Sequence, residues 1–324
     1  MKRLTFLLAA SVMLVCNTAF AEPTATWDGF LKNAPHTAKE ADQMSLVLNQ
    51  LYLGELNQLD RSPIRWWVQQ SRQHCQQNIQ SAQARVGKTA PTYSPHWKQA
   101  AQHFLSDYAA EQAKLARLYP KYSSEIHLEP NEQAGWELAD GSFRLTFDDG
   151  PKPVNTQHVI ESLRSAHLPA TFFLVGKRIQ ESHSSGNMPN YQGFTLGNHS
   201  FDHSNLATLA EDQVRWQLQK TQETAQASGR PLSKQFRAPY GSRGARELKV
   251  ADRLGLQSVL WNVDSQDWQD SMQSQPGRIA SRTLALMLLN RRGIVLMHDI
   301  HAQTGRELDR LIPILKAIDY HIVD

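Results

Sequence analysis

The residue types that could perform chemistry are concentrated in five short segments, at 148–149, 199–203, 237–240, 264–268 and 296–299. The segments contain carboxylates, imidazoles and one guanidinium, spaced a few residues apart. Each segment alone has an ordinary explanation, because an Asp-Asp-Gly-Pro sequence is typical of a turn and paired histidines occur on many surfaces. Their succession within one part of the chain indicates that they serve a common site.

His199 and His203 are four residues apart, so both rings can face one way from a single turn and bind one metal ion. One carboxylate, from Asp148 or Asp149, would complete the ligand set. Two histidines and one acid leave coordination positions open for water and substrate, as in catalytic sites, whereas structural zinc usually has four protein ligands.

The same segments contain groups for proton transfer. The adjacent side chains of Asp148 and Asp149 diverge, so one can bind the metal ion while the other acts as a base on water. Arg237 is suited to keep that base ionised at neutral pH, and His298 is available as a general acid. The pattern therefore predicts metal-assisted hydrolysis with a separate base and acid.

The elements that position these residues are short β-rich runs alternating with helical stretches. The predicted strands are Phe143–Phe147, Ala170–Val175, Phe194–Asn198, Gln235–Arg237, Gln257–Val263, Ile294–Met297 and Tyr320–Val323. One intervening helix is predicted to begin at a capping box, Thr208 with Glu211, and to stop at Gly229. This alternation predicts a parallel sheet forming a small closed or nearly closed barrel, with functional groups where strands end.

Residues 22–135 have apolar residues at the spacing typical of helices, and they lack the residue types of a catalytic site. A capping box, Thr37 with Glu40, predicts the start of a first helix. The sequences Ser62-Pro63 and Ser94-Pro95 predict two further starts, and Gly87 and Pro120 mark the corresponding ends. We expect three antiparallel helices whose function is positioning, substrate reach or partner contact.

The first 21 residues are typical of a cleaved signal peptide: a basic start, an apolar stretch from Leu4 to Val15, and Ala19-Phe20-Ala21 before the cut. No other segment is apolar enough to suggest a membrane span. We therefore expect an exported protein, periplasmic or secreted.

Charge and cysteine content limit the partners. Without residues 1–21 the chain keeps 32 of its 34 basic residues against 31 acidic ones, a net charge of +1, which argues against nucleic acid as a partner. Cys75 is then the only cysteine, so no internal disulfide can form, and we expect a buried, inert thiol.

The five segments resemble, complete and in order, the motifs of the NodB-homology polysaccharide deacetylases, carbohydrate esterase family four, from about Phe143 to the C-terminus. The resemblance implies a distorted (β/α) barrel of about seven strands. It also implies an amide hydrolase that removes N-acetyl groups from N-acetylglucosamine-containing poly- or oligosaccharides of the chitin or peptidoglycan type, releasing acetate. The implied cofactor is a divalent metal ion, zinc or alternatively cobalt or nickel.

The resemblance also implies a role for individual residues. Asp149, His199 and His203 would bind the metal ion, Asp148 would be the general base and His298 the general acid.

The remaining roles implied by the family support this centre. Arg237 would orient the base, and Asp267 would tune the acid. The main-chain N–H of Tyr240 would help to hold the oxyanion, while Trp268 and Leu296 would line the groove around the acetyl group.

The domain boundaries that we predict are a signal peptide at 1–21, a helical domain at 22–135 and a deacetylase domain at 142–324. One departure from the family concerns Glu181–Gln192, where relatives have a regular helix and this sequence is typical of a loop. The helical domain has no counterpart in the resemblance.

Three other functions fit parts of the pattern. An O-acetyl esterase acting on xylan-like polysaccharide uses the same attack of water on a carbonyl group. A non-haem iron oxygenase also uses two histidines and a carboxylate, but needs neither the base nor the acid. An inactive sugar-binding module would favour degenerate motifs, and none of the five is degenerate.

Overall fold

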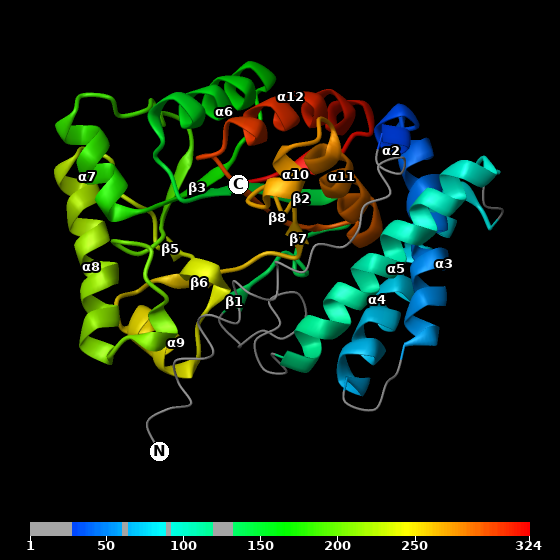
Figure 1. Ribbon diagram of the computed structural model, residues 1–324, viewed down its shortest axis with the longest axis horizontal. Coiled ribbons are helices and arrows are strands. Elements are labelled where there is room, and N and C mark those ends of the chain that lie inside the picture. The colour runs from blue at the N-terminus through cyan, green and yellow to red at the C-terminus, as the bar shows by residue number, and fades with distance from the viewer. Residues whose placement is uncertain (1–27, 60–63, 89–91, 119–131) are drawn as a thin grey trace.

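The computed structural model describes residues 28–59, 64–88, 92–118 and 132–324. The signal peptide predicted at 1–21 and the helix start predicted at Ser62-Pro63 lie outside these ranges. The N-terminal helices lie beside a curled sheet that is surrounded by further helices (Figure 1). Every strand pair in the sheet is parallel, so the predicted distorted (β/α) barrel preceded by a helical region is confirmed.

The described part of the N-terminal region contains one short helix followed by three long ones: α2 (Asp28–Lys32), α3 (Ala38–Gln58), α4 (Arg65–Val86) and α5 (Pro95–Leu118). The side chain of Thr37 accepts a hydrogen bond from the N–H of Glu40, as the capping box predicts. The Ser94 hydroxyl caps α5 in the same way, accepting from the N–H of Trp97 at 3.2 Å. Gly87, with a φ of 84°, ends α4 because glycine adopts a left-handed conformation without strain.

The sheet contains nine short strands: β1 (Glu132–Gln133), β2 (Ser142–Asp148), β3 (Thr171–Leu174), β4 (Thr195–Asn198), β5 (Gln235–Phe236), β6 (Gln257–Val259), β7 (Val263–Asp264), β8 (Gly293–His298) and β9 (His321–Ile322). Their spatial order is β1-β6-β5-β4-β3-β2-β8-β7, with β9 also paired to β2. Six residues of β2 pair with β8 in register, from Phe143 with Gly293 to Asp148 with His298. This long pairing places the carboxyl ends of β2 and β8 side by side.

Helices and two 3-10 turns connect the strands: α6 (Pro153–Ala166), α7 (Gly176–Ser184), η1 (Leu206–Thr208), α8 (Glu211–Ala227), η2 (Pro239–Gly241), α9 (Ala245–Arg253), α10 (Asp270–Gln273), α11 (Arg278–Asn290) and α12 (Ala302–Ala317). The core lies between these helices and the sheet. Phe147 and Phe172, on neighbouring strands, are fully buried there, with ring centroids 5.1 Å apart.

Apart from shifts of a residue at strand ends, the sheet differs from the prediction in two places. The single strand predicted at Gln257–Val263 is interrupted, because Arg237 donates hydrogen bonds to the carbonyls of Val259 and Leu260, at 3.0 and 2.9 Å. A side chain therefore takes the place of a neighbouring strand between β6 and β7. Strand β1 was not predicted, since two polar residues carry no hydrophobic pattern.

Two local predictions between the strands were wrong. The first four residues of the predicted loop at Glu181–Gln192 are helical, because α7 buries Ile179 and Ser182 on one face. The capping box predicted at Thr208 is absent, since Thr208 ends the turn η1. Helix α8 begins after Ala210, whose N–H donates to the Gln213 side chain at 3.0 Å.

The helical region packs against the barrel through α11. Every residue of α11 from Ile279 to Asn290 is buried, whereas a surface helix buries only one face. Side-chain amides of Asn49 and Asn78, on α3 and α4, both donate to the carbonyl of Leu289, at 3.0 and 2.8 Å. That carbonyl lies in the last turn of α11, where backbone acceptors have no partner within the helix.

Charged groups reinforce this interface at the end of α11. The Arg291 side chain is 1% exposed and forms ion pairs with Asp42 at 2.8 Å and Asp140 at 2.9 Å. Arg85, from α4, pairs with the same Asp140. One buried guanidinium thus joins α3 to the chain just before β2.

Two further predictions concern the whole chain. The one described cysteine, Cys75, is buried, and burial raises the pKa of its thiol to about 12, in agreement with the expected inert side chain. Among the described residues, none of the helices has the length and apolar character needed to span a bilayer.

We expect Asn78→Ala to destabilise the barrel as well as the helical region, by about 1–3 kcal/mol, because it removes a buried donor to the end of α11. Hydrogen exchange at the amides of α11 and β8, measured with increasing urea, reports the barrel. Gln77→Ala, at the exposed neighbouring position, is the control. If Asn78→Ala weakened the protection of α3 and α4 alone, the two regions would unfold independently and the interface would not stabilise the barrel.

Candidate active site

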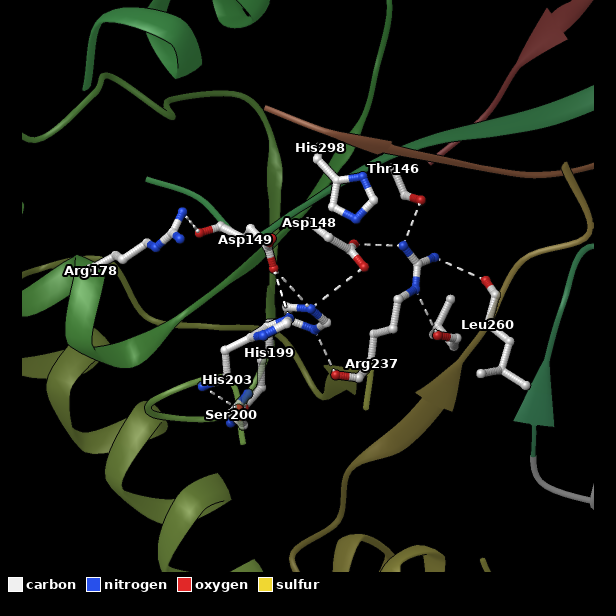
Figure 2. A network of polar contacts seen from close by, with 12 residues as sticks. Thr146, Asp148, Asp149, Arg178, His199, Ser200, His203, Arg237, Leu260 and His298 are labelled. Atoms are coloured by element: carbon white, nitrogen blue, oxygen red, sulfur yellow. Dashed lines mark hydrogen bonds and ion pairs between the residues drawn. The ribbon is translucent and has the colours of Figure 1, made fainter. Parts of the chain in front are cut away.

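The predicted site residues lie at the carboxyl ends of parallel strands, which meet at one edge of the barrel. Asp148 is the last residue of β2, and Asn198, before His199, is the last of β4. Arg237 directly follows β5, and His298 ends β8. Figure 2 shows the side chains from these strand ends pointing toward one another.

Asp149, His199 and His203 form a compact cluster. The Oδ1 of Asp149 lies 3.0 Å from Nε2 of His203 and 3.4 Å from Nε2 of His199. One ligand atom from each residue lies within 4.8 Å of the other two. Ligands of a tetrahedral zinc ion, each about 2.1 Å from the metal, are roughly 3.4 Å apart, so these separations suit a shared cation.

The hydrogen bonding of the cluster also fits a metal ion. His199 Nδ1 lies 2.8 Å from the carbonyl oxygen of Arg237, to which only a protonated Nδ1 can donate. In the neutral ring, Nε2 then has a free lone pair directed at the cluster. The buried Oδ1 of Asp149 receives no hydrogen bond. A cation would satisfy this arrangement of acceptors.

Asp148, beside this cluster, is held by Arg237. The carboxylate is 3% exposed, and its Oδ1 accepts from the Arg237 guanidinium at 2.7 Å. Its other oxygen, Oδ2, lies 3.7 Å from His199 Nε2 (Figure 2). One oxygen of Asp148 is therefore fixed by a buried cation while the other faces the metal-ligand cluster.

His298 lies beside Asp148 across the β2–β8 pair and has its own carboxylate partner. Its Nδ1 is 2.7 Å from Oδ1 of Asp267, whose Oδ2 accepts from the Thr304 hydroxyl at 2.6 Å. Burial lowers the pKa of His298, but the charge and hydrogen bond of Asp267 outweigh it, and with Asp149 and Asp148 they raise the pKa to about 10. Asp267 therefore favours the imidazolium form of His298, and the Nδ1 contact leaves Nε2 directed away from this partner.

The loops of the site are strained. Asp149, Ser200, His203, Tyr240 and Gln266 all have positive φ angles, between 55° and 75°, although none is glycine. Such backbone conformations cost free energy and persist only where the surroundings impose them. They aim the side chains of the site away from the directions that regular strands would give.

The three residues predicted to bind substrate differ in exposure. Tyr240 is 45% exposed, and its ring packs edge-on against His203 at 4.7 Å between centroids. Trp268 is 38% exposed and directly follows Asp267. Leu296 is only 4% exposed and belongs to a small buried cluster with Phe173 and Trp261. Two of the three therefore present surface to a ligand.

Several contributors to the site were not predicted from the sequence. Thr146 accepts a hydrogen bond from Arg237 at 2.8 Å, and Arg178 donates to the Asp149 carbonyl at 3.0 Å. Thr304 lies on α12, 37 positions from its partner Asp267. The rings of Phe173 and Trp261 lie 4.3 and 5.4 Å from the Arg237 guanidinium. Only Thr146, within a predicted strand end, carried a signal that could have identified it.

Comparison with known proteins extends the resemblance seen in the sequence. Residues 137–259 match the family described as "Polysaccharide deacetylase". The chitooligosaccharide deacetylase of Azorhizobium caulinodans is 40% identical over 129 residues, which cover 40% of this chain and 61% of that protein. The chitooligosaccharide deacetylase of Sinorhizobium fredii is 32% identical over 188 residues, covering 54% of this chain and 85% of that protein.

The structural comparison agrees with these relatives. The solved structure of the Bc1960 peptidoglycan N-acetylglucosamine deacetylase has a TM-score of 0.52 and 27% identity, and the match covers 60% of this chain and 90% of that one. The chain spans 37–62% of the length of the first curated relatives that it matches. The family predicted from the five motifs is confirmed: this chain belongs to the polysaccharide deacetylases of carbohydrate esterase family four.

Proposed function

We propose that this protein is a metal-dependent hydrolase that removes N-acetyl groups from N-acetylglucosamine-containing poly- or oligosaccharides and releases acetate. One observation carries the proposal. Asp148 and His298 occupy paired positions on neighbouring strands, each fixed by a buried partner of opposite charge, beside the three-residue metal-ligand cluster. A base and an acid next to a cation site are the groups that amide hydrolysis needs.

Asp149, His199 and His203 are the residues that would hold the metal ion. A bound divalent ion supplies a Lewis acid for the acetyl carbonyl and lowers the pKa of a bound water. Zinc is the ion that we propose, because two imidazoles and a carboxylate are typical of catalytic zinc sites. Cobalt and nickel accept the same ligands.

Asp148 would accept the proton of the attacking water through the oxygen that faces the cluster. Its other oxygen is bonded to Arg237, which favours the ionised carboxylate that a base requires. Addition of hydroxide to the acetyl carbon forms a tetrahedral intermediate. The main-chain N–H of Tyr240 would donate a hydrogen bond to the oxyanion of this intermediate.

His298 would then donate its proton to the departing nitrogen as the C–N bond breaks. Asp267 accepts a hydrogen bond from Nδ1–H of the imidazolium, so Nε2 would present the other proton to the substrate. The products are acetate and a free amino sugar. Trp268 and Leu296 are assigned to the groove around the acetyl group, Trp268 by its exposed ring.

The names of the relatives support the substrate class that we propose. The relatives described above are named as deacetylases of chitooligosaccharide and of peptidoglycan N-acetylglucosamine. We propose an acetylated amino-sugar polymer or oligomer of these types, with an O-acetyl group on xylan-like polysaccharide as the alternative. We further propose that the protein is exported to the periplasm or secreted, on the basis of the predicted signal peptide.

The first test measures acetate released from chitin oligosaccharides, peptidoglycan and acetylxylan under identical conditions. We expect release from one or both of the amino-sugar substrates, and abolition of activity by chelation. His203→Ala should lose metal binding and activity together. Loss of a residue that only hydrogen-bonds a metal ligand costs about 10–100-fold, and loss of a ligand itself should cost more.

His183→Ala, which changes a histidine on α7 outside the cluster, is the matched control. Release from acetylxylan alone would replace the proposed function by the esterase alternative. A folded His203→Ala protein that kept full activity after chelation would contradict the metal assignment.

The second prediction concerns the leaving group. We expect His298→Ala to slow hydrolysis of an N-acetyl sugar by about 10²–10⁴-fold, because an amine departs only after protonation. An activated aryl acetate should be affected much less, since its phenolate departs unaided. Partial misfolding would slow both reactions by the same factor, so the ratio of the two losses is independent of it. Equal losses on both substrates would exclude His298 as the acid.

The third prediction concerns pH. His298 acts when protonated, so the rate should fall as pH rises through its raised pKa. Asp267→Asn removes the main charge that raises this pKa, and should move the alkaline limb to lower pH while leaving the acid limb unchanged. A bound cation lowers the pKa in both proteins, so the difference between them is the measured quantity. Asp270→Asn, at an exposed neighbouring position, is the control with the same charge change. An unmoved alkaline limb in Asp267→Asn would mean that His298 does not set it.

A further inference from the structure

The loop between β7 and α10 carries two groups of the proposed site, Asp267 and Trp268. Its backbone is held by short-range bonds: the Gln266 N–H donates to the Asp264 carboxylate at 2.8 Å, and the Asp267 N–H donates to the Ser265 hydroxyl at 3.3 Å. Gln266 has a left-handed φ of 55°. This conformation is unfavourable for a residue with a side chain, so the loop needs support from outside.

That support comes from the N-terminal helical region. The side chain of Gln266 donates a hydrogen bond to Oε1 of Glu111, which lies on α5, 155 positions earlier in the chain. The other oxygen of the Glu111 carboxylate, Oε2, lies 3.2 Å from the guanidinium of Arg282. Arg282 in turn donates to the carbonyl of Asp264 at 2.9 Å. The Glu111 carboxylate thus holds the loop directly at Gln266. Through Arg282 it also holds Asp264, from which the loop starts.

Arg282, one of the two partners of this carboxylate, is enclosed by neighbouring side chains. The Arg282 side chain is only 7% exposed, and its guanidinium lies 5.8 Å from the centre of the Tyr108 ring, also on α5. Helix α5 packs against α2 and α3, which contact α11 of the barrel. The Glu111 side chain is 32% exposed, so solvent screens its contacts less than it screens those of a fully exposed ion pair.

From this geometry we propose that Glu111 is a positioning residue of the active site, supplied by the N-terminal helical region. It fixes the loop so that Asp267 meets the His298 ring and Trp268 faces the groove. The inference rests on the proposed function, in which His298 is the general acid. A displaced Asp267 would leave the imidazole without its partner and misdirect the proton that the leaving amine needs.

The first experiment compares Glu111→Ala with Asp107→Ala in the full chain. Asp107 is a carboxylate one turn earlier on α5, 60% exposed and paired only locally with His103 at 3.6 Å. We expect Glu111→Ala to reduce kcat on an N-acetyl sugar by about 10–100-fold, as misplacement of a catalytic group does, and kcat on an activated aryl acetate by less than about twofold. Asp107→Ala should change neither. Glu111→Gln keeps an acceptor for Gln266 but loses the charge facing Arg282, so its loss should be intermediate.

A double-mutant cycle tests whether the effect passes through Gln266. In the Gln266→Ala background, Glu111→Ala should add much less to the loss than it does in the native background, because the direct contact is already gone. Fully additive losses, or equal losses on amide and aryl ester, would overturn the positioning role and leave Glu111 as a general contributor to stability.

A second readout does not depend on turnover. The Nδ1 proton shared between His298 and Asp267 should give a downfield NMR signal in ¹⁵N-histidine protein, assigned by its absence in His298→Ala. We expect Glu111→Ala to shift or broaden this signal and Asp107→Ala to leave it unchanged. If the native enzyme hydrolysed no amide while the signal still depended on Glu111, the proposed function would fail and the positioning role would stand. An unaltered signal together with an unaltered amide-to-ester ratio would overturn the positioning role itself.

Discussion

A single buried guanidinium, that of Arg237, connects most parts of the site. Its three nitrogens donate to the carbonyls of Val259 and Leu260, to Thr146 and to Asp148, all within 2.7–3.0 Å. Burial lowers the pKa of Arg237, and the charge of Asp148 opposes that effect. A buried cation without such partners would cost several kcal/mol, so the sheet and the Asp148 carboxylate are stabilised by the same contacts.

The backbone of Arg237 extends this connection to the metal-ligand cluster. Its carbonyl oxygen is the acceptor for His199 Nδ1, which determines the ring nitrogen that faces the cluster. One residue therefore interrupts the strand after Val259, holds the proposed base and orients a proposed metal ligand. Replacing it would disturb the sheet and the chemistry at once, which is why loss of activity in an Arg237 variant would not by itself reveal a catalytic role.

The opposite side of the site depends on the helical region. Helix α11 is buried on every face because α2, α3 and α4 cover the side that would otherwise meet water. Asn78 and Arg291 satisfy polar groups at its end, and Glu111 reaches the loop that carries Asp267. The region without catalytic residue types is thus continuous with the barrel in packing and in hydrogen bonding.

The sequence predicted those features that depend on local rules. The strand ends and the caps at Thr37 and Ser94 follow from patterns a few residues long, and the structure has them. The proposed site residues could be found because parallel strands deliver their carboxyl ends to one edge, so separate motifs must converge. Thr208 was misassigned because a Ser/Thr-x-x-Glu pattern is local, whereas the packing that starts α8 at Ala210 is not.

The sequence could not predict contacts between residues that lie far apart in the chain and belong to no motif. Glu111 has the sequence character of a solvated helix residue, and only the fold places its carboxylate against Gln266 and Arg282. The same holds for Thr304, which bonds Asp267 from α12. Both act through Asp267 and touch neither the proposed ligand cluster nor the proposed acid. Motifs mark the groups that face a substrate, whereas the residues that hold those groups in place can lie anywhere that the fold brings near them, including a region that otherwise has no catalytic character.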